Sequence, residues 1–515
     1  MKNGFRKIVY TVLSLGALFI IGTITVNVIL KKKLETFIQE RLPQNMIRAY
    51  DDITVETFGG SLSITNASLI IKNKENGAKH TFINVDELKI SDISFWDYLF
   101  NAEIHIGAIT LNNPTLAYYE DRITKKKNTK DNGLISVYKP IFIDHLRITN
   151  TTFAIYENAQ DSTKLYTNGL SIAIDGIKIN TQKISRKIPF EYEGYSAKSD
   201  SIFVKVSEYE NLTVEDFSIE NRTAILKDLN LLTKYSKREL SKLISKERDH
   251  YDLSLHSLAI EDIDFGFKNN RFFAESKMVS LTAPSLEIYR DKLVADETKT
   301  KPLYSKMLRD LPMDLTIDSL KISDAKILYE ERQNAENMGG SINFKNLEAS
   351  ISNVSNTYSS PTKTKAKINA DFMENTPITV DWSFDVQDKN DRFLFRADVG
   401  HLVADRLNSF TEPNLKVKLE GTTNQTYFTI DGNNDTSTID MKIKYSDFKV
   451  LLLQNEGERK NKFLSAVANI FISKNSQEKN ENYKEGTAEA TRNKSKSVFN
   501  FLWLNVKNAL KKILI

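Results

Sequence analysis

The sequence predicts a mainly β protein, with an amino-terminal transmembrane helix followed by a long, curled antiparallel β-sheet that forms an elongated groove, and a few amphipathic helices. Three observations support this fold class. A charge-free run opens the chain, short segments of alternating apolar and polar residues fill its middle, and an amphipathic segment ends it. Alternation with a period of two is typical of antiparallel strands. No long helical segments separate the strands, which argues against a layered parallel fold.

The composition excludes several classes of protein. The 515 residues include 71 basic and 67 acidic side chains, for a net charge of +4, and no cysteine. A chain without cysteine has no disulfide scaffold, thiolate zinc site, iron–sulfur cluster or cysteine nucleophile. Because strongly cationic domains are typical of nucleic-acid binders, a nearly neutral chain predicts no nucleic-acid partner.

The charge-free run extends from Ile8 to Leu30, and basic residues flank both of its ends. As a helix it would be about 34 Å long, enough to cross a hydrocarbon core of roughly 30 Å. The run is longer than the core of a signal peptide, and no small-residue cleavage pattern follows it. We therefore predict a signal anchor over residues 1–33, with a cleaved export signal as the alternative. The anchor residues are Ile8, Leu13, Leu18, Phe19, Ile20, Ile24, Val28 and Leu30.

Residues 34–453 are predicted to form the sheet, and they contain an irregular repeat. In each copy an apolar residue is followed by others at +3, +5 and +10, with Asn, Asp or Pro near +7. We expect each copy to form a strand, a short turn or bulge, and a second strand. The copies begin at Val85, Ile106, Ile143, Leu255 and Ile317. The residues predicted to line the groove are Val85, Leu88, Ile90, Ile106, Ile109, Leu111, Ile143, Leu146, Ile148, Ile317, Leu320 and Ile322.

Two further segments are predicted to be helical. Residues 227–250 place leucines at helical spacing, which predicts a helix that caps one end of the sheet or, alternatively, lies on a membrane surface or acts as a lid. In the carboxyl-terminal region, 454–515, we expect a polar linker or exposed hairpin over 474–497 and an amphipathic helix over 498–515. Such a helix suits either a membrane interface or a plug in an apolar groove. Its apolar face is predicted to contain Phe499, Leu502, Trp503, Val506 and Leu510.

The sequence contains no recognisable catalytic or metal-binding motif. Its six histidines form no H-x-x-x-H pair, and there is no G-x-S-x-G elbow, P-loop or G-x-G-x-x-G sequence. We therefore expect no enzymatic activity, no catalytic residues, no cofactor and no metal site.

The organisation resembles that of the AsmA-like family, envelope proteins of two-membrane bacteria that are related to bridge-like lipid-transfer proteins. The likeness depends on three segments. They are FGGSLSITNASLII at 58–71, the run of strands at 83–121, and MKIKYSDFKVLLL at 441–453 with the later Lys-Ser-x-Phe-Asn-Phe-Leu-Trp helix. The resemblance implies a β-sheet groove, apolar inside, that carries acyl chains between membranes.

The resemblance also implies a location and partners. We expect a single-pass protein of the inner membrane, with its body in the periplasm, acting in lipid transport, outer-membrane lipid homeostasis or assembly. Its partners would be membrane lipids and envelope proteins. The alternative is an anchored β-sandwich scaffold or interaction protein, in which two inner faces interdigitate and no lipid groove exists. The inward face distinguishes the two, because an uncovered apolar face leaves surface that acyl chains could cover.

Overall fold

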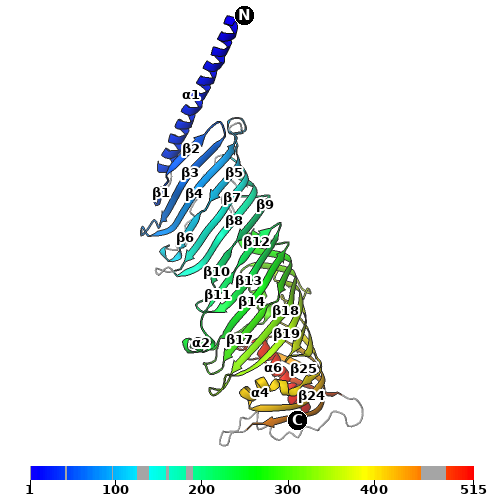
Figure 1. Ribbon diagram of the computed structural model, residues 1–515. Coiled ribbons are helices and arrows are strands. Elements are labelled where there is room, and N and C mark those ends of the chain that lie inside the picture. Colours follow the sequence, from blue (N-terminus) through cyan, green and yellow to red (C-terminus); the bar gives the residue numbers. More distant parts are fainter. Residues whose placement is uncertain are drawn as a thin grey trace. The chain divides into compact units, whose positions relative to one another are not determined.

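The structure, a computed structural model, describes residues 2–40, 43–94, 97–123, 139–157, 162–180, 190–453 and 483–514, the first of these ranges without side chains up to residue 18 (Figure 1). Strands account for 59% and helices for 16%, which confirms the mainly β class. The chain divides into two compact units. Unit 1 comprises Met1–Val206 with Val214–Asn221, and unit 2 comprises Ser207–Thr213 with Arg222–Ile515.

The elements follow one another with short connections. Up to residue 221 they are α1 (Lys2–Glu40), β1 (Met46–Ala49), β2 (Asp52–Glu56), β3 (Ser61–Lys72), β4 (Lys79–Ile93), η1 (Asp97–Asn101), β5 (Ile104–Asn112), β6 (Thr115–Tyr119), η2 (Glu120–Arg122), β7 (Ile141–Tyr156), β8 (Thr163–Ile179), β9 (Gly194–Ser199), β10 (Ser201–Lys205), β11 (Glu210–Val214) and β12 (Asp216–Glu220). After it they are β13 (Thr223–Thr233), α2 (Lys237–Leu243), β14 (Asp249–Glu261), β15 (Asp264–Lys268), β16 (Arg271–Thr282), β17 (Ser285–Asp291), α3 (Tyr304–Arg309), β18 (Asp314–Arg332), β19 (Gly340–Ser355), β20 (Thr364–Phe372), β21 (Thr376–Phe384), β22 (Phe393–Val399), β23 (Leu402–Val403), η3 (Ala404–Leu407), α4 (Asn408–Leu415), β24 (Val417–Gly432), β25 (Thr436–Leu452), β26 (Lys484–Thr491) and α6 (Val498–Leu514).

The strand pairing is mixed, whereas the sequence predicted an antiparallel sheet. In unit 1, β3 pairs antiparallel with β4, and β4 with both β5 and β6, which lie end to end. Both β5 and β6 then pair in parallel with β7, which pairs antiparallel with β8. The chain returns from the end of β6 to the start of β7 at the other end of the sheet, so the neighbours run in the same direction.

Unit 2 repeats this arrangement and extends it. There β14 pairs antiparallel with β16 and β17, and these two pair in parallel with β18. From β18 onward the neighbours β19, β20, β21, β22, β24, β25 and β26 are antiparallel. Since both units contain a long strand, a broken strand and a second long strand in this order, the arrangement is a duplicated structural element.

The +7 position of the sequence repeat has a defined conformation. In every predicted copy its residue has a positive φ, which Asn and Asp tolerate better than other non-glycine residues. These residues are Asp92 (φ 56°), Asn113 (49°), Asn150 (56°), Asp262 (54°) and Asp324 (55°). At two of them, Asn150 and Asp324, the register with the next strand shifts. A kink of this kind bends the strand and changes which side chains face each side. The repeated feature is therefore a bulge with its flanking apolar residues.

Replacing Asn150 with Val is expected to lower the free energy of unfolding by about 1–2 kcal/mol, because a β-branched residue is strained at this φ. The substitution also removes the hydrogen bond that Asn150 Nδ2 donates to Asn113 Oδ1 at 2.8 Å. Asn150→Gly should cost less, because glycine adopts this conformation freely. Urea unfolding measures the difference, with Thr149→Val at the exposed neighbouring position as the control. Equal losses for Asn150→Val and Thr149→Val would contradict the assigned role of the kink.

The helix predicted over residues 227–250 is shorter than expected. Only Lys237–Leu243 form a helix, α2, whereas Leu229 and Leu232 lie on β13. The left-handed residue Asp228 interrupts the alternation of this strand, so its leucines imitate helical spacing. Ser236 caps α2, since its side chain accepts a hydrogen bond from Glu239 N and the Glu239 side chain returns one to Ser236 N.

The carboxyl-terminal region also differs in part from its prediction. Within the expected polar linker 474–497, residues Lys484–Thr491 form β26, which pairs with β25; residues 474–482 lie outside the described ranges. The predicted helix is present as α6 and lies against β25 and β26 (Figure 1). The alternation in KEGTAEAT explains the strand, because Ala488 and Ala490 are buried while Glu485, Thr487 and Glu489 are exposed.

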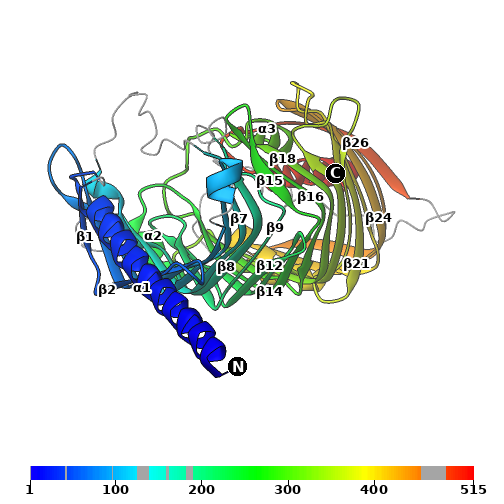
Figure 2. The ribbon, with the colours of Figure 1, turned by 90° about the horizontal axis from the view of Figure 1, so that it is seen from above.

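The predicted anchor lies in α1, beside β1 and β2 (Figure 2). Within the part of the chain that the structure describes, no helix combines the length and the apolar content needed to cross a membrane. The side chains of Ile8, Leu13 and Leu18 lie outside that part. The other anchor residues are exposed or, at Leu30, half-buried; the exposed ones are Phe19, Ile20, Ile24 and Val28.

Candidate apolar binding face

Unit 1 presents rows of aliphatic side chains on one face of its sheet. Residues that lie directly opposite one another on neighbouring strands project from the same face. The register therefore groups the predicted lining residues of β4, β5 and β7 with unpredicted partners on β3 and β8 into two rows. The first row is Leu62, Ile90, Ile109, Leu146 and Ile174, and the second is Ile64, Leu88, Leu111, Ile148 and Ile172. We call these ten residues the unit 1 apolar face.

Every residue of the unit 1 apolar face is half-buried. Neighbouring side chains cover their flanks, but none of them reaches the burial expected beneath a second layer. In unit 2, by comparison, Ile430 and Ile439 lie on a sheet face covered by α6 and are each 0% exposed. Among the described residues, no helix or strand covers the unit 1 apolar face in the way that α6 covers β25.

The remaining predicted residues of unit 1 lie at one end of this face. Ile106 and Ile143 are directly opposite each other, and Ile93 and Ile177 continue their row on β4 and β8. Ile143 and Ile177 are buried. Val85 is also buried and lies opposite Ala67 on β3.

The opposite face of the same strands is polar. Lys89, Thr110 and Arg147 alternate with the apolar residues and lie opposite one another across β4, β5 and β7. Arg147 Nη2 donates to Asp175 Oδ1 at 2.6 Å, and the His145 ring lies 2.8 Å from the same oxygen. These hydrogen bonds, from His145 and from Arg147, hold the pKa of Asp175 below its usual value. The sheet of unit 1 thus has one solvated face and one apolar face.

Unit 2 continues the same pattern on its own strands. The predicted residues Leu320 and Ile322 of β18 begin two rows, while Ile317 lies opposite Val354 on β19. The first row runs Leu320, Ile351, Ala366, Trp382, Phe395, Ile430 and Ile439, and the second runs Ile322, Ala349, Ile368, Val380, Ala397, Phe428 and Met441. Their exposure falls from half-buried at β18 to buried at β25, where α6 covers them.

The face that α6 turns toward the sheet is rotated from the predicted one. Its buried residues are Val498, Phe501, Leu502, Asn505, Ala509 and Ile513. Of the predicted apolar face, Leu502 is buried, Val506 and Leu510 are half-buried, and Phe499 and Trp503 are exposed. The helix accepts a polar residue in its buried face because Asn505 is fully hydrogen-bonded: its Oδ1 accepts from Ser437 Oγ at 2.9 Å and its Nδ2 donates to Phe501 O at 2.9 Å.

A buried ionic cluster ties the segment before α6 to the sheet of unit 2. The carboxylate of Glu247, which is 3% exposed, accepts hydrogen bonds from Lys292 Nζ at 2.7 Å and from Lys496 Nζ at 2.8 Å. Close by in the chain, Arg290 donates two hydrogen bonds to Asp249, each 2.6 Å long. Burial opposes ionisation of Glu247, but the two lysines outweigh it and lower its pKa to about 2. We call these five residues the ionic cluster.

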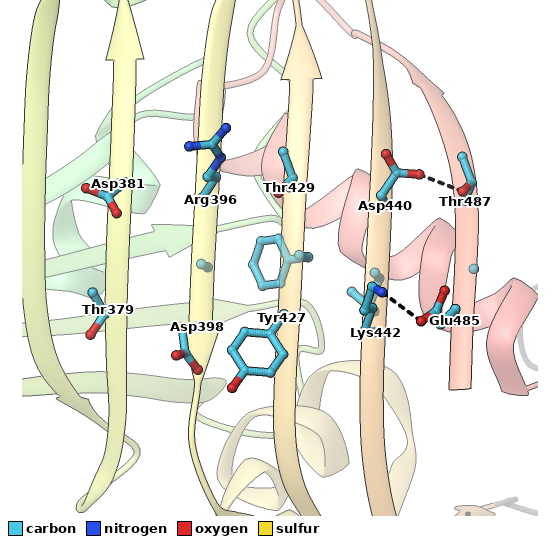
Figure 3. Close-up of a pocket in the computed structure, with 14 residues that line it drawn as sticks. Thr379, Asp381, Arg396, Asp398, Tyr427, Thr429, Asp440, Lys442, Glu485 and Thr487 are labelled. Carbon is cyan, nitrogen blue, oxygen red and sulfur yellow. Dashed lines mark hydrogen bonds and ion pairs between the residues drawn. The ribbon is translucent and has the colours of Figure 1, made fainter. Parts of the chain in front are cut away.

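A depression on the other face of unit 2 is polar (Figure 3). It is lined by alternate residues of β21, β22, β24, β25 and β26. Two cross-strand interactions lie within it: Lys442 Nζ to Glu485 Oε1 at 2.8 Å, and Thr487 Oγ1 to Asp440 Oδ1 at 2.6 Å. Because cross-strand pairs of this kind are ordinary for a solvated sheet face, we assign the depression no binding role. Among the described residues, no group of three or more His, Asp or Glu side chains could hold a metal ion.

Sequence reasoning missed one copy of the repeat in unit 2. Ser276, Val279 and Leu281 lie opposite Ile317, Leu320 and Ile322 in parallel register, and Ala283 occupies the +7 position with a φ of 51°. The serine at the first position and the alanine at +7 hid this copy. The spacing of Val279, Leu281 and Leu286 was the remaining signal. No protein-family model matches this sequence, and comparison with curated proteins gave no significant match.

Proposed function

We propose that this protein binds the acyl chains of membrane lipids on the apolar faces of its sheets. It would act in lipid transport or outer-membrane lipid homeostasis, or in assembly, as the resemblance to the AsmA-like family implies. In this proposal α1 anchors the chain in the inner membrane and the sheets lie in the periplasm.

The observation that supports the proposal most is the half-buried state of the ten residues in the unit 1 apolar face. Contiguous apolar surface of this kind is rare on soluble monomers and marks a binding site. A lipid tail fits the chemistry, because each methylene group removed from water contributes about 0.8 kcal/mol. The polar opposite face, with Arg147 and Asp175, suits exposure to water instead.

The alternative, an anchored β-sandwich scaffold, requires a second layer over these rows. A sandwich buries both inner faces against each other at a spacing of about 10 Å. Ile430 and Ile439 show how complete burial beneath a covering element is in this chain, and the unit 1 apolar face lacks that burial.

Full-length protein extracted in a mild detergent should retain phospholipid, detectable by native mass spectrometry. Ile109→Asp places a carboxylate on the apolar face and should reduce bound lipid by roughly tenfold or more, because an ionised carboxylate is not tolerated against acyl chains. Thr110→Asp, one residue later on the polar face, should retain lipid. Circular dichroism confirms that both variants fold. Lipid-free wild-type protein, or equal lipid content in the two variants, would refute the proposal.

A further inference from the structure

Helix α1 lies along β2, and three contacts fix how the two are aligned. Near the end of the charge-free run, Lys31 Nζ donates to Asp52 Oδ1 at 2.7 Å. Further toward the amino terminus, Asn27 Oδ1 accepts a hydrogen bond from Thr57 N at 2.8 Å. Beyond that, the rings of Phe19 and Phe58 meet edge to face, with their centroids 5.1 Å apart. The helix and the strand therefore run in opposite directions side by side (Figures 1 and 2).

The lengths of the two segments agree with this alignment. From Lys31 back to Phe19 a helix rises about 18 Å, and from Asp52 to Phe58 an extended chain covers about 20 Å. The turn between β2 and β3 is consequently level with the charge-free run of α1. An anchor that spans a bilayer would bring this turn to the membrane.

Two large aromatic side chains are exposed at this end of the sheet. Phe58 in the turn is 78% exposed, and Phe100 in η1 is 65% exposed. The turn and the β4–η1 junction are adjacent, since Ile93 N donates to Gly60 O at 3.0 Å. We call Phe58 and Phe100 the aromatic edge. Aromatic residues at such positions are typical of segments that enter a membrane interface.

We propose that the aromatic edge inserts into the bilayer in which α1 is anchored, so that lipids reach the unit 1 apolar face directly from one leaflet. This inference rests on the proposed function. The polar pair of Asn27 and Thr57 marks the headgroup level, and Phe58 lies on the hydrocarbon side of it. From Ile8 to Val26 the helix spans about 28 Å, close to the roughly 30 Å of a hydrocarbon core.

The neighbouring residues limit the depth of insertion and give it a purpose. Glu56, two residues before Phe58, has an exposed side chain, and a carboxylate is costly inside the hydrocarbon. The insertion is therefore shallow. Leu62, the first member of a row in the unit 1 apolar face, lies two residues beyond Gly60. An acyl chain that leaves the bilayer beside Phe58 meets apolar side chains almost at once.

Because the chain has no cysteine, single cysteines can report the depth of chosen positions in the full-length protein. Phe58→Cys, Phe100→Cys and Ile20→Cys carry an environment-sensitive fluorophore, in vesicles of phosphatidylcholine and phosphatidylglycerol. Lys74→Cys, exposed in the turn at the other end of β3, is the matched control. Nitroxide-labelled lipids should quench the labels at 20, 58 and 100 several-fold more than the label at 74, and aqueous iodide should show the reverse order.

The lipid content of the same preparations separates this inference from the function on which it rests. Iodide access at 58 and 100 equal to that at 74, in protein that carries lipid, would overturn the insertion and leave lipid binding intact. Lipid quenching at 58 and 100 in protein that carries no lipid would support the insertion and overturn the proposed function. A label at 20 that is open to iodide would overturn the insertion, because α1 would then lie outside the bilayer.

Discussion

Replacing Glu247 with Gln is expected to lower the stability of unit 2 by about 3–5 kcal/mol, because it leaves buried charges without their partner. The carboxylate is 3% exposed and accepts hydrogen bonds from both Lys292 and Lys496. A neutral amide cannot compensate two ammonium groups. Since Lys496 immediately precedes α6, the loss should be largest in the carboxyl-terminal segment. Hydrogen exchange of residues 492–514 measures it residue by residue.

The same carboxylate predicts a pH dependence. Its pKa is about 2 in the folded protein and 4.5 in the unfolded chain, so the folded state binds the proton less tightly. The stability that this difference contributes, about 3 kcal/mol, is fully present above pH 4.5 and is lost as the pH falls toward 2. In Glu247→Gln this part of the acid dependence should disappear. The exposed Glu336→Gln is the control and should change stability by no more than about 0.5 kcal/mol. Unchanged protection in Glu247→Gln would show that the ionic cluster does not hold the segment.

The sequence was sufficient for the fold class because alternation is a local signal. The rows of the unit 1 apolar face begin as such alternation, at Leu88 and Ile90 or at Ile109 and Leu111. Pairing is not local. Nothing in β5 or β7 alone indicates that Ile109 lies in parallel register with Leu146, since that depends on where the chain returns after β6.

The candidate face was predictable only in part, for a related reason. Residues on β3 and β8, such as Ile64 and Ile172, carry no complete copy of the repeat, and register alone places them in the rows. The left-handed residue Asp228 similarly made the leucines of β13 resemble a helix. In α6, helical spacing placed Phe499 and Trp503 on the apolar face, whereas the sheet selected the side that presents Phe501 and the hydrogen-bonded Asn505. Each miss concerns which neighbour an element meets.

Phe501→Ala should destabilise the docking of α6 by about 3–5 kcal/mol, the usual cost of removing a buried phenyl ring. Phe501 is 2% exposed and its ring meets that of Phe393 edge to face, with centroids 6.2 Å apart. Phe499, two residues earlier on the same helix, is 61% exposed. Phe499→Ala should therefore change stability by no more than about 0.5 kcal/mol, although it removes the same number of atoms from a helix of the same propensity.

The readout for this pair is hydrogen exchange of the α6 amides, together with binding of an apolar fluorescent dye. If α6 covers the end of an otherwise continuous apolar face, loosening it should expose Ile439 and Met441 on β25, and Phe501→Ala should bind more dye than wild-type protein. Phe499→Ala should bind no more dye than wild-type protein. Equal exchange in the two variants would mean that contacts of α6 other than the Phe501 ring hold it in place. Faster exchange without additional dye would mean that the face beneath α6 closes when the helix leaves, which a groove for acyl chains could not do.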